Sequence, residues 1–150
     1  DDKLSKYRNS SIGFIFQEFH LEPHLTVKEN VLLPTFFNHK TQKDDINAER
    51  LIKEVKLSKK TNSLASELSG GEKQRTAIAR ALINNPKIII ADEPTGNLDI
   101  KTGETIINLL KNLQKNHNIT LIIATHDEKI ARSAKKIIKI SEGKIKKRLC

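Results

Sequence analysis

Leu-Ser-Gly-Gly-Glu-Lys-Gln-Arg at residues 68–75 is the stretch from which the rest of the chain can be interpreted. Ser69 and Glu72 have the spacing of a capping box, which predicts that a helix begins there. Gly70 and Gly71 leave the backbone N–H groups of the first turn without side chains above them. Such a helix N-terminus can bind a phosphate or another anion, although an ordinary capped helix after a turn has the same pattern.

A second informative stretch is Ile-Ile-Ile-Ala-Asp-Glu at residues 88–93. Its apolar, β-branched run predicts a strand that is buried on both faces of a parallel sheet. The strand ends in Asp92 and Glu93, at the edge where α/β sheets bind their ligands. This pair of carboxylates could hold a metal ion, or it could lie in a solvated turn. An anion-binding helix start followed by an acidic strand end predicts nucleotide chemistry.

The composition is that of one domain with a net charge of +9. No apolar run reaches the roughly 18 residues that a membrane-spanning helix needs, and the first residues lack the apolar core of a signal peptide. The single cysteine, Cys150, cannot form an internal disulfide, which fits a reducing cytoplasm. The lysines are spread along the chain and the five phenylalanines do not interleave with them, so nucleic acid is not an expected partner.

The part of the chain before residue 68 is predicted to contain one strand and a helical segment. Residues 11–16 are β-branched and aromatic and predict the strand, which Gln17 follows directly. In the helical segment, Thr26 and Glu29 repeat the capping-box spacing, and Pro34 should end or kink the helix that starts there. The other predictions for this segment are a turn at 38–45, a helix at 48–57 and a polar connector at 57–67.

The part after residue 68 alternates between helices and strands. A helix with one buried face is predicted at 70–84, and Asp99 is a plausible N-cap for a second helix. Residues 119–124 predict a second buried strand, after which Thr125 and Glu128 have capping-box spacing. The predicted buried residues of the two helices are Ala77, Ile78, Ala81 and Leu82 in the first and Ile106, Leu109, Leu110 and Leu113 in the second. A hairpin with strands at 137–140 and 144–149 is expected to follow.

These stretches resemble the motifs of ABC-type ATPases in residue type, order and spacing. Residues 68–74 resemble the signature motif, residues 88–93 the Walker B strand with its catalytic glutamate, and residues 94–99 the loop that follows. Residues 125–127, Thr-His-Asp, resemble the segment with the switch histidine. Within the superfamily, the sequence looks closest to the exporter ATPases of the LolD/MacB type.

The resemblance implies an α/β fold, namely part of a P-loop NTPase domain of the ABC type with a mostly parallel sheet and an inserted helical subdomain. Residues 1–17 and 76–150 would form a partial RecA-like catalytic core, and residues 18–75 would form the helical subdomain that ends in the signature motif. A phosphate-binding Gly-x-x-x-x-Gly-Lys-Ser/Thr loop and an upstream adenine-stacking aromatic residue are absent from the sequence. The chain therefore resembles the C-terminal two-thirds of such a domain. Alone, it is expected to be inactive and to leave part of its sheet uncovered.

For a complete domain, the resemblance also implies roles for individual residues. Asp92 would hold Mg²⁺, and Gln17 would complete the coordination shell. Glu93 would polarise the water that attacks the γ-phosphate of ATP, and His126 would contact that phosphate. The remaining nucleotide-binding residues, which would act at the interface with a second copy, are Ser69, Gly70, Gly71, Glu72 and Asp99.

The resemblance further implies a cellular role as the ATP-binding subunit of an exporter or lipoprotein-release transporter. Two copies, or one copy and a related ATPase subunit, would bind ATP and Mg²⁺ head to tail and drive transmembrane permease subunits. The protein would be cytoplasmic and peripheral on the inner face of the cell membrane. Two alternatives stay open: a soluble ABC-type ATPase that acts on nucleic acid or ribosomes, and a truncated, non-catalytic remnant. The loop at residues 96–99 favours the transporter group.

Overall fold

A three-stranded parallel sheet organises the computed structural model, which describes residues 10–38 and 41–149. Its strands are β1 (Ile12–Ile15), β2 (Ile88–Asp92) and β3 (Thr120–Ala124), with β2 in the middle. Ile15 pairs with Ala91, and Asp92 pairs with Ala124, so that all three strands end at the same edge of the sheet. The three strands expected from β-branched runs are therefore confirmed, as is the α/β class.

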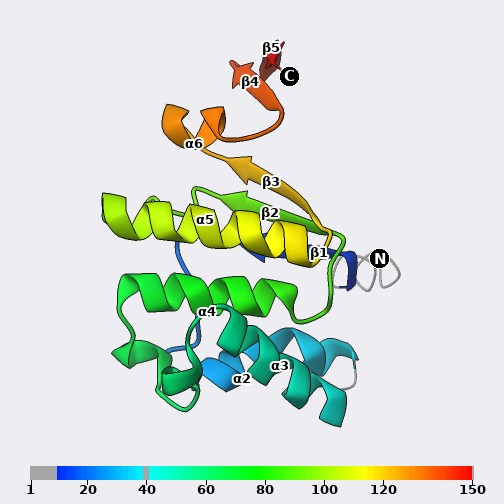
Figure 1. The fold of residues 1–150 in the computed structure, drawn as a ribbon, viewed down its shortest axis with the longest axis vertical. Helices are drawn as coiled ribbons and strands as arrows, with labels where there is room; N and C mark the ends of the chain where they lie inside the picture. The colour runs from blue at the N-terminus through cyan, green and yellow to red at the C-terminus, as the bar shows by residue number, and fades with distance from the viewer. Residues whose placement is uncertain (1–9, 39–40, 150) are drawn as a thin grey trace.

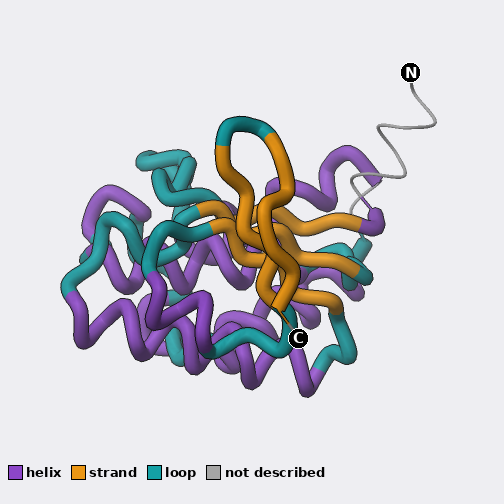
Figure 2. Tube along the Cα trace, turned by 90° about the horizontal axis from the view of Figure 1, so that it is seen from above, coloured by secondary structure: helices purple, strands orange, loops and turns teal. Residues whose placement is uncertain are grey.

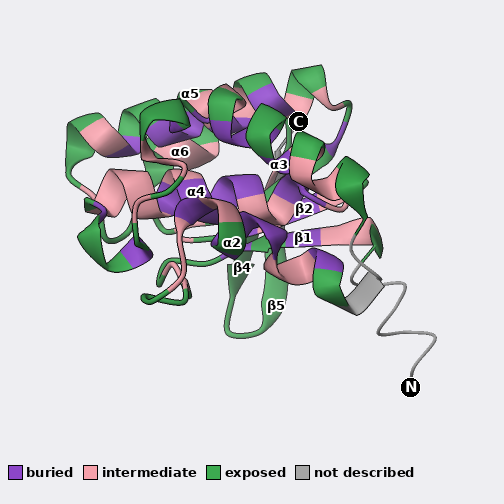
Figure 3. Cartoon of the chain, turned by 90° about the horizontal axis from the view of Figure 1, so that it is seen from below, coloured by how far each residue is buried: buried purple, intermediate pink, exposed green. Residues whose placement is uncertain are grey.

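Two long helices, α4 (Gly70–Leu82) and α5 (Ile100–Asn116), lie side by side, with α4 against β1 and α5 against β3 (Figure 1). A further layer, α2 (Val27–Leu32) and α3 (Gln42–Glu54), packs on the other side of α4. The prediction of a single buried face for α4 is wrong, because this helix is sandwiched between the sheet and that layer (Figure 3). The buried residues of α4 are Gln74, Thr76, Ala77, Ile78, Ala79 and Leu82.

The helical segment starts as its first capping box predicts. The Glu29 carboxylate accepts the backbone N–H of Thr26 at 2.8 Å, and α2 gives way at Leu33 to a 3₁₀ helix, η1 (Leu33–Asn38), that contains Pro34. The predicted helix start at residue 48 is wrong, as is the part of the predicted turn at 42–45, and residues 39–40 of that turn lie outside the described residues. Helix α3 already begins at Gln42, because the carboxylate of Asp44 accepts the backbone N–H of the N-cap Thr41 at 2.6 Å. Two short 3₁₀ helices, η2 (Ser58–Lys60) and η3 (Ala65–Glu67), occupy the predicted polar connector.

Helix α5 is capped by Asp99, as predicted, through a 3.0 Å hydrogen bond from the backbone N–H of Thr102. Its buried residues include Ile107, whereas Leu109, which was predicted to be buried, is only half-buried. The buried face of α5 is therefore rotated slightly from the predicted one. The capping-box interpretation of Thr125 and Glu128 is wrong. Helix α6 (Glu128–Arg132) is capped instead by Asp127, whose carboxylate accepts from Lys129 N at 2.7 Å.

A two-stranded antiparallel hairpin, β4 (Ile137–Ser141) and β5 (Lys144–Leu149), follows α6 as predicted. Its turn residues Glu142 and Gly143 have φ values of 52° and 70°, the left-handed pair that suits a two-residue hairpin loop. The hairpin lies beyond β3 and α6, at the end of the molecule farthest from α2 and α3 (Figure 1). Within the described ranges, none of the helices combines the length and the apolar character that crossing a bilayer requires.

The sheet has a covered face and an open face, and most of the helical segments lie on one side of its strands (Figure 2). Ile15, Ile89 and Ala91 belong to the covered face and are buried. Phe14 and Ile122 are on the other face, each in register with Ile90, and their exposed fractions are 41% and 49%. Among the described residues, an apolar surface of the sheet therefore stays open.

Candidate functional site

Four of the side chains singled out from the sequence meet at one edge of the parallel sheet. Gln17 lies two residues after β1, Asp92 ends β2 with Glu93 next to it, and His126 lies two residues after β3. The in-register pairing of β2 with both neighbours places these strand ends side by side. Carboxylate, amide and imidazole groups thus gather where parallel sheets bind their ligands.

Glu93 has an unusual backbone conformation directly after β2. Its φ of 42° is left-handed, which is uncommon for a residue other than glycine and often marks a functional site. The backbone N–H of Glu93 donates to the carbonyl oxygen of Ala124 at 2.9 Å. The chain therefore turns sharply at Glu93 while it stays attached to the end of β3.

The carboxylate of Glu93 is held by the two residues that follow β3. One oxygen, Oε1, accepts from the backbone N–H of His126 at 2.7 Å and lies 2.7 Å from His126 Nδ1. The other oxygen, Oε2, accepts from the hydroxyl of Thr125 at 3.1 Å. The Glu93 side chain is 22% exposed and that of His126 is 87% exposed. An ionised carboxylate only accepts hydrogen bonds, so Nδ1 carries the ring proton when His126 donates to it.

These contacts decide the charge of Glu93. Partial burial by itself would raise the pKa of this carboxyl group. The hydrogen bonds from His126 and Thr125 outweigh that effect, and the net result is a lowered pKa for Glu93. At neutral pH the group is therefore ionised, and it can accept a hydrogen bond from a water molecule that approaches the sheet edge.

Gln17 is fixed against the loop that follows β2. Its Nε2 donates to Asn97 Oδ1 at 3.3 Å, and Asn97 Nδ2 donates to the backbone oxygen of Gln17 at 3.1 Å. Gly96 allows this close approach, because a Cβ atom there would lie 2.7 Å from Gln17 Nε2. With its amide nitrogen engaged by Asn97, Gln17 has its amide oxygen left for a ligand.

The oxygen ligands at the sheet edge were tested for their chemical fit to Mg²⁺. Asp92 is exposed at the end of β2 and, with the amide oxygen of Gln17 nearby, offers the hard oxygen ligands that Mg²⁺ prefers. Among the described residues, no group of three or more His, Cys, Asp or Glu side chains could enclose a metal ion. Mg²⁺ usually keeps several waters and binds through one or two protein groups plus substrate phosphates, and this donor set matches that mode.

The start of α4 forms the second part of the site. Ser69 is the N-cap, and its backbone N–H and its hydroxyl both donate to Glu72 Oε2, at 2.9 and 2.8 Å. These bonds lower the pKa of Glu72. The predicted capping box is therefore confirmed. Its hydrogen bonds come from the side chains of Ser69 and Glu72. The N–H groups of Gly70 and Gly71 at the first turn keep the electrostatic character that attracts anions. A Cβ atom at Gly71 would lie 2.8 Å from Thr102 Cγ2, so this glycine also lets α4 approach α5 closely.

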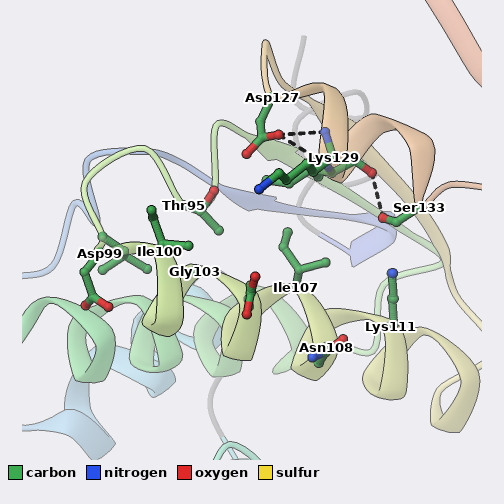
Figure 4. Close-up of a pocket in the computed structure, with 13 residues that line it drawn as sticks. Thr95, Asp99, Ile100, Gly103, Ile107, Asn108, Lys111, Asp127, Lys129 and Ser133 are labelled. Atoms are coloured by element: carbon green, nitrogen blue, oxygen red, sulfur yellow. Dashed lines mark hydrogen bonds between the residues drawn. The ribbon is translucent and has the colours of Figure 1, made fainter.

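Asp99 lies between two hollows on the surface. The first, of about 350 Å³, is lined by Ser69, Gly70, Gly71 and Arg75 on one side and by residues 97–99 and Thr102 on the other. The second, of about 530 Å³, lies between α5 and α6 (Figure 4). Hydrogen bonds from the first turn of α5, with Thr102 first, lower the pKa of Asp99, which is therefore an anion at neutral pH.

Sequence reasoning missed three residues that organise the site, namely Thr125, Asn97 and Gln74. Thr125 was assigned to a helix cap, because its spacing to Glu128 fits one. Gln74 was predicted on no buried face, yet it is fully buried and donates to the backbone oxygen of Pro94 at 2.7 Å. In each case the partner is far away in the chain, so local spacing held no signal for the contact.

Comparison with known proteins identifies the family. A family model described as "ABC transporter" matches residues 1–96. The chain is 48% identical over 143 residues to the lipoprotein-releasing system ATP-binding protein LolD 1 of Rhodopirellula baltica, covering 95% of this chain and 62% of that protein. It is 44% identical over 152 residues to the uncharacterized ABC transporter ATP-binding protein MJ0796 of Methanocaldococcus jannaschii, covering 98% of this chain and 65% of that protein.

Solved structures show the same similarity. The dimeric, post-hydrolysis structure of the MJ0796 cassette bound to ADP and Pi superposes with a TM-score of 0.85 at 43% identity, covering 99% of this chain and 66% of that chain. The chain thus spans a little under two thirds of the length of these relatives. The predicted fold class, part of a P-loop NTPase domain of the ABC type, is confirmed. The chain belongs to the ABC transporter family.

Proposed function

We propose that this chain is part of the ATP-binding subunit of an ABC transporter of the exporter or lipoprotein-release type, and that the complete protein hydrolyses ATP. The observation that carries the proposal is the ionised carboxylate of Glu93, held at the sheet edge beside Asp92 and Gln17. Relatives named for lipoprotein release and for macrolide export, at 48% and 42% identity, support the transporter type.

Asp92 and Gln17 form the metal side of the proposed site. Asp92 would bind Mg²⁺, directly or through a water molecule, and the amide oxygen of Gln17 would complete the coordination shell. Bound there, Mg²⁺ would neutralise charge on the phosphate groups. Asn97 and Gly96 keep Gln17 at this edge, so the protein contributes a fixed ligand orientation.

Glu93 is the proposed general base. Its carboxylate accepts a hydrogen bond from a water molecule and takes the water proton as the water oxygen bonds to the γ-phosphorus. The bond between that phosphorus and the bridging oxygen breaks, and the electron pair leaves with ADP. His126 has a largely exposed ring next to Glu93. Protonated at both nitrogens, it would keep Nδ1–H on Glu93 and donate from Nε2 to the γ-phosphate oxygens as their charge shifts.

The start of α4 is proposed to act on nucleotide held by a second copy of the protein. The first-turn N–H groups of Gly70 and Gly71 and the hydroxyl of Ser69 would bind the γ-phosphate across the interface, and Glu72 would hold Ser69 in place. Asp99 would lie at the seam between the two copies. The similar structure of a dimeric cassette bound to ADP and Pi supports a dimer that binds nucleotide.

The partners follow from this arrangement. The helical subdomain, proposed as residues 18–75, would transmit closure of the dimer to transmembrane permease subunits, and residues 1–17 and 76–150 would belong to the catalytic core. The protein would act at the cytoplasmic face of the cell membrane. Relatives named as parts of transport systems, such as LolD and CbiO1 of Clostridium perfringens, which is part of the ABC transporter complex CbiONQ, support these partners.

Substitution of Glu93 in the full-length protein tests the proposed function. Glu93→Gln keeps the size of the side chain but removes the base, so ATP turnover should fall by about 10²–10⁴-fold while ATP binding persists. Glu128→Gln, at an exposed carboxylate paired with Arg132 in α6, is the matched control and should turn over ATP like the wild type. Wild-type turnover by Glu93→Gln, or a wild-type protein without ATPase activity, would contradict the proposal.

A further inference from the structure

Thr125 holds the one oxygen of Glu93 that His126 does not hold. Oε1 of Glu93 has two contacts with His126, through the backbone N–H and through Nδ1, both at 2.7 Å. Oε2 has a hydrogen bond of 3.1 Å from the hydroxyl of Thr125. A carboxylate oxygen accepts about two hydrogen bonds. Oε1 is therefore fully used, and Oε2 keeps one position free for a water molecule.

The direction of the Thr125 hydroxyl is fixed by a second contact. Its oxygen accepts the backbone N–H of Asp127 at 3.1 Å, which leaves the hydroxyl proton for Glu93. Asp127 is itself held, because its carboxylate caps α6 by accepting from Lys129 N at 2.7 Å. Thr125 is also β-branched and half-buried, so its side chain has few alternative rotamers. The hydroxyl is thus presented to Glu93 by a rigid turn.

Without Thr125, nothing described at the site would fix the plane of the Glu93 carboxylate. The terminal torsion of a glutamate side chain is broad, so hydrogen bonds to a single oxygen still allow the group to rotate. The imidazole of His126 is largely exposed and, on the proposed function, also contacts phosphate during the reaction. The hydroxyl of Thr125 has no such second task.

We propose that Thr125 is a positioning residue for ATP hydrolysis: its hydroxyl sets the orientation of the Glu93 carboxylate, so that the free position on Oε2 points at the attacking water. This inference rests on the proposed function, in which Glu93 is the base. Thr125 would act through Glu93 and not directly on water or nucleotide. Loss of its hydroxyl should lower kcat on the order of ten- to a hundredfold and leave KM for ATP unchanged, because misorientation of a base affects the chemical step and not ground-state binding.

The test compares Thr125→Val, which keeps the shape of the side chain and removes the hydroxyl, with Thr125→Ser, which keeps the hydroxyl. Steady-state ATPase rates of the full-length protein should show the loss of kcat in Thr125→Val and recovery to within about threefold of wild type in Thr125→Ser. Adding Thr125→Val to Glu93→Gln should cause no further loss, because the two residues act as one unit. Melting temperatures of all variants control for folding.

Each other outcome overturns the proposal. Wild-type kcat in Thr125→Val, equal losses in Thr125→Val and Thr125→Ser, or the same factor lost from the residual rate of Glu93→Gln would each show that the hydroxyl does not orient Glu93. If Thr125→Val does not fold, Thr125→Ala takes its place, and failure of both would assign Thr125 to the fold. Failure of the proposed function is separate, because it appears as wild-type turnover in Glu93→Gln alone.

Discussion

Gln74 donates a hydrogen bond of 2.7 Å from its side-chain amide to the backbone carbonyl of Pro94. Gln74 is fully buried in the helix that Ser69 caps, and Pro94 directly follows Glu93. This buried contact therefore joins α4 to the turn that carries the proposed base, Glu93. The amide oxygen of Gln74 has no hydrogen-bond partner among the residues that the structure describes, so its amide nitrogen alone offsets the cost of burying this group.

Replacing Gln74 should weaken this connection measurably. In Gln74→Leu the carbonyl of Pro94 loses its buried donor, which should lower the free energy of unfolding by about 1–3 kcal/mol, with removal of the unpaired amide oxygen favouring the lower end. Urea denaturation of the full-length protein measures the change. Lys73→Leu, one residue earlier and only half-buried, is the control. Equal stability of the two variants would show that the bond between Gln74 and Pro94 contributes nothing.

Two glycines should respond in opposite directions to alanine. A Cβ atom at Gly13 in β1 would lie 2.4 Å from the backbone oxygen of Ala81 in α4, so Gly13→Ala must separate strand and helix and should cost about 1–3 kcal/mol. At Gly103, inside α5, the Cβ atom would approach Thr95 no closer than 3.4 Å. Gly103→Ala should therefore stabilise the protein by about 0.5–1 kcal/mol through helix propensity.

Thermal unfolding of the wild-type and the two variant proteins measures both effects. Two-state transitions allow the shifts to be converted to free energies. A stable Gly13→Ala protein would mean that β1 and α4 lie farther apart than in this structure. A destabilised Gly103→Ala protein would mean that the start of α5 is packed more tightly against Thr95 than the distance of 3.4 Å indicates.

Local signals explain why much of the fold could be predicted. The capping boxes at Thr26 and Ser69 and the β-branched runs of the three strands act over a few residues, and the sequence contains them in full. The gathering of Gln17, Asp92 and His126 also followed from sequence, because residues after parallel strands reach the same edge of a sheet. The order and spacing of the motifs indicated the ABC-type ATPase fold.

What could not be predicted depends on packing between distant segments. The burial of α4 on both sides follows from the layer of α2 and α3 beneath it, which a stripe of apolar residues does not reveal. Thr125 has the spacing of a capping box with Glu128, yet Asp127 is the residue that caps α6. The hydroxyl of Thr125 therefore donates to Glu93 instead. The early start of α3 shows the same limit, since the cap there uses Asp44 where a longer acidic or amide residue is the usual partner.

Gly71 should be essential at the proposed dimer interface. In a Glu93→Gln background, ATP should drive the full-length protein to dimerise, and Gly71→Asp should prevent this, because its carboxylate would face the negative charge of the γ-phosphate. Light scattering with and without ATP measures the dimer. Unchanged ATP-induced dimers in Gly71→Asp would contradict the proposed role of the start of α4.

The control must separate charge from crowding, because a Cβ atom at Gly71 would lie 2.8 Å from Thr102 Cγ2 of the same chain. Thr102→Ser removes that methyl group and keeps the backbone N–H that Asp99 accepts. Paired with Thr102→Ser, Gly71→Ala should dimerise with ATP, whereas Gly71→Asp should not. If neither double variant dimerised, the loss of dimers would come from local packing. If both dimerised, charge repulsion by Asp at position 71 would not explain the loss.

Residues 1–150 alone should not bind Mg-ATP with useful affinity, although they include Gln17, Asp92, Glu93 and His126. These residues address the metal, the water and the γ-phosphate, whereas most ground-state affinity for a nucleotide comes from groups around the α- and β-phosphates and the base. The sequence has no Gly-x-x-x-x-Gly-Lys-Ser/Thr motif to supply them. Losing even ~4 kcal/mol of binding free energy weakens affinity about a thousandfold.

Calorimetry of residues 1–150 with Mg-ATP decides this, with the full-length Glu93→Gln protein as the positive control. Sedimentation velocity must accompany it, because the open sheet face with Phe14 and Ile122 should promote association. Ile122→Lys should reduce that association, and Ile46→Lys, at a 70% exposed position in α3, should not. Micromolar binding of Mg-ATP by a monodisperse 1–150 protein would prove the prediction wrong. It would mean that the strand ends and the start of α4 bind the nucleotide without a phosphate loop.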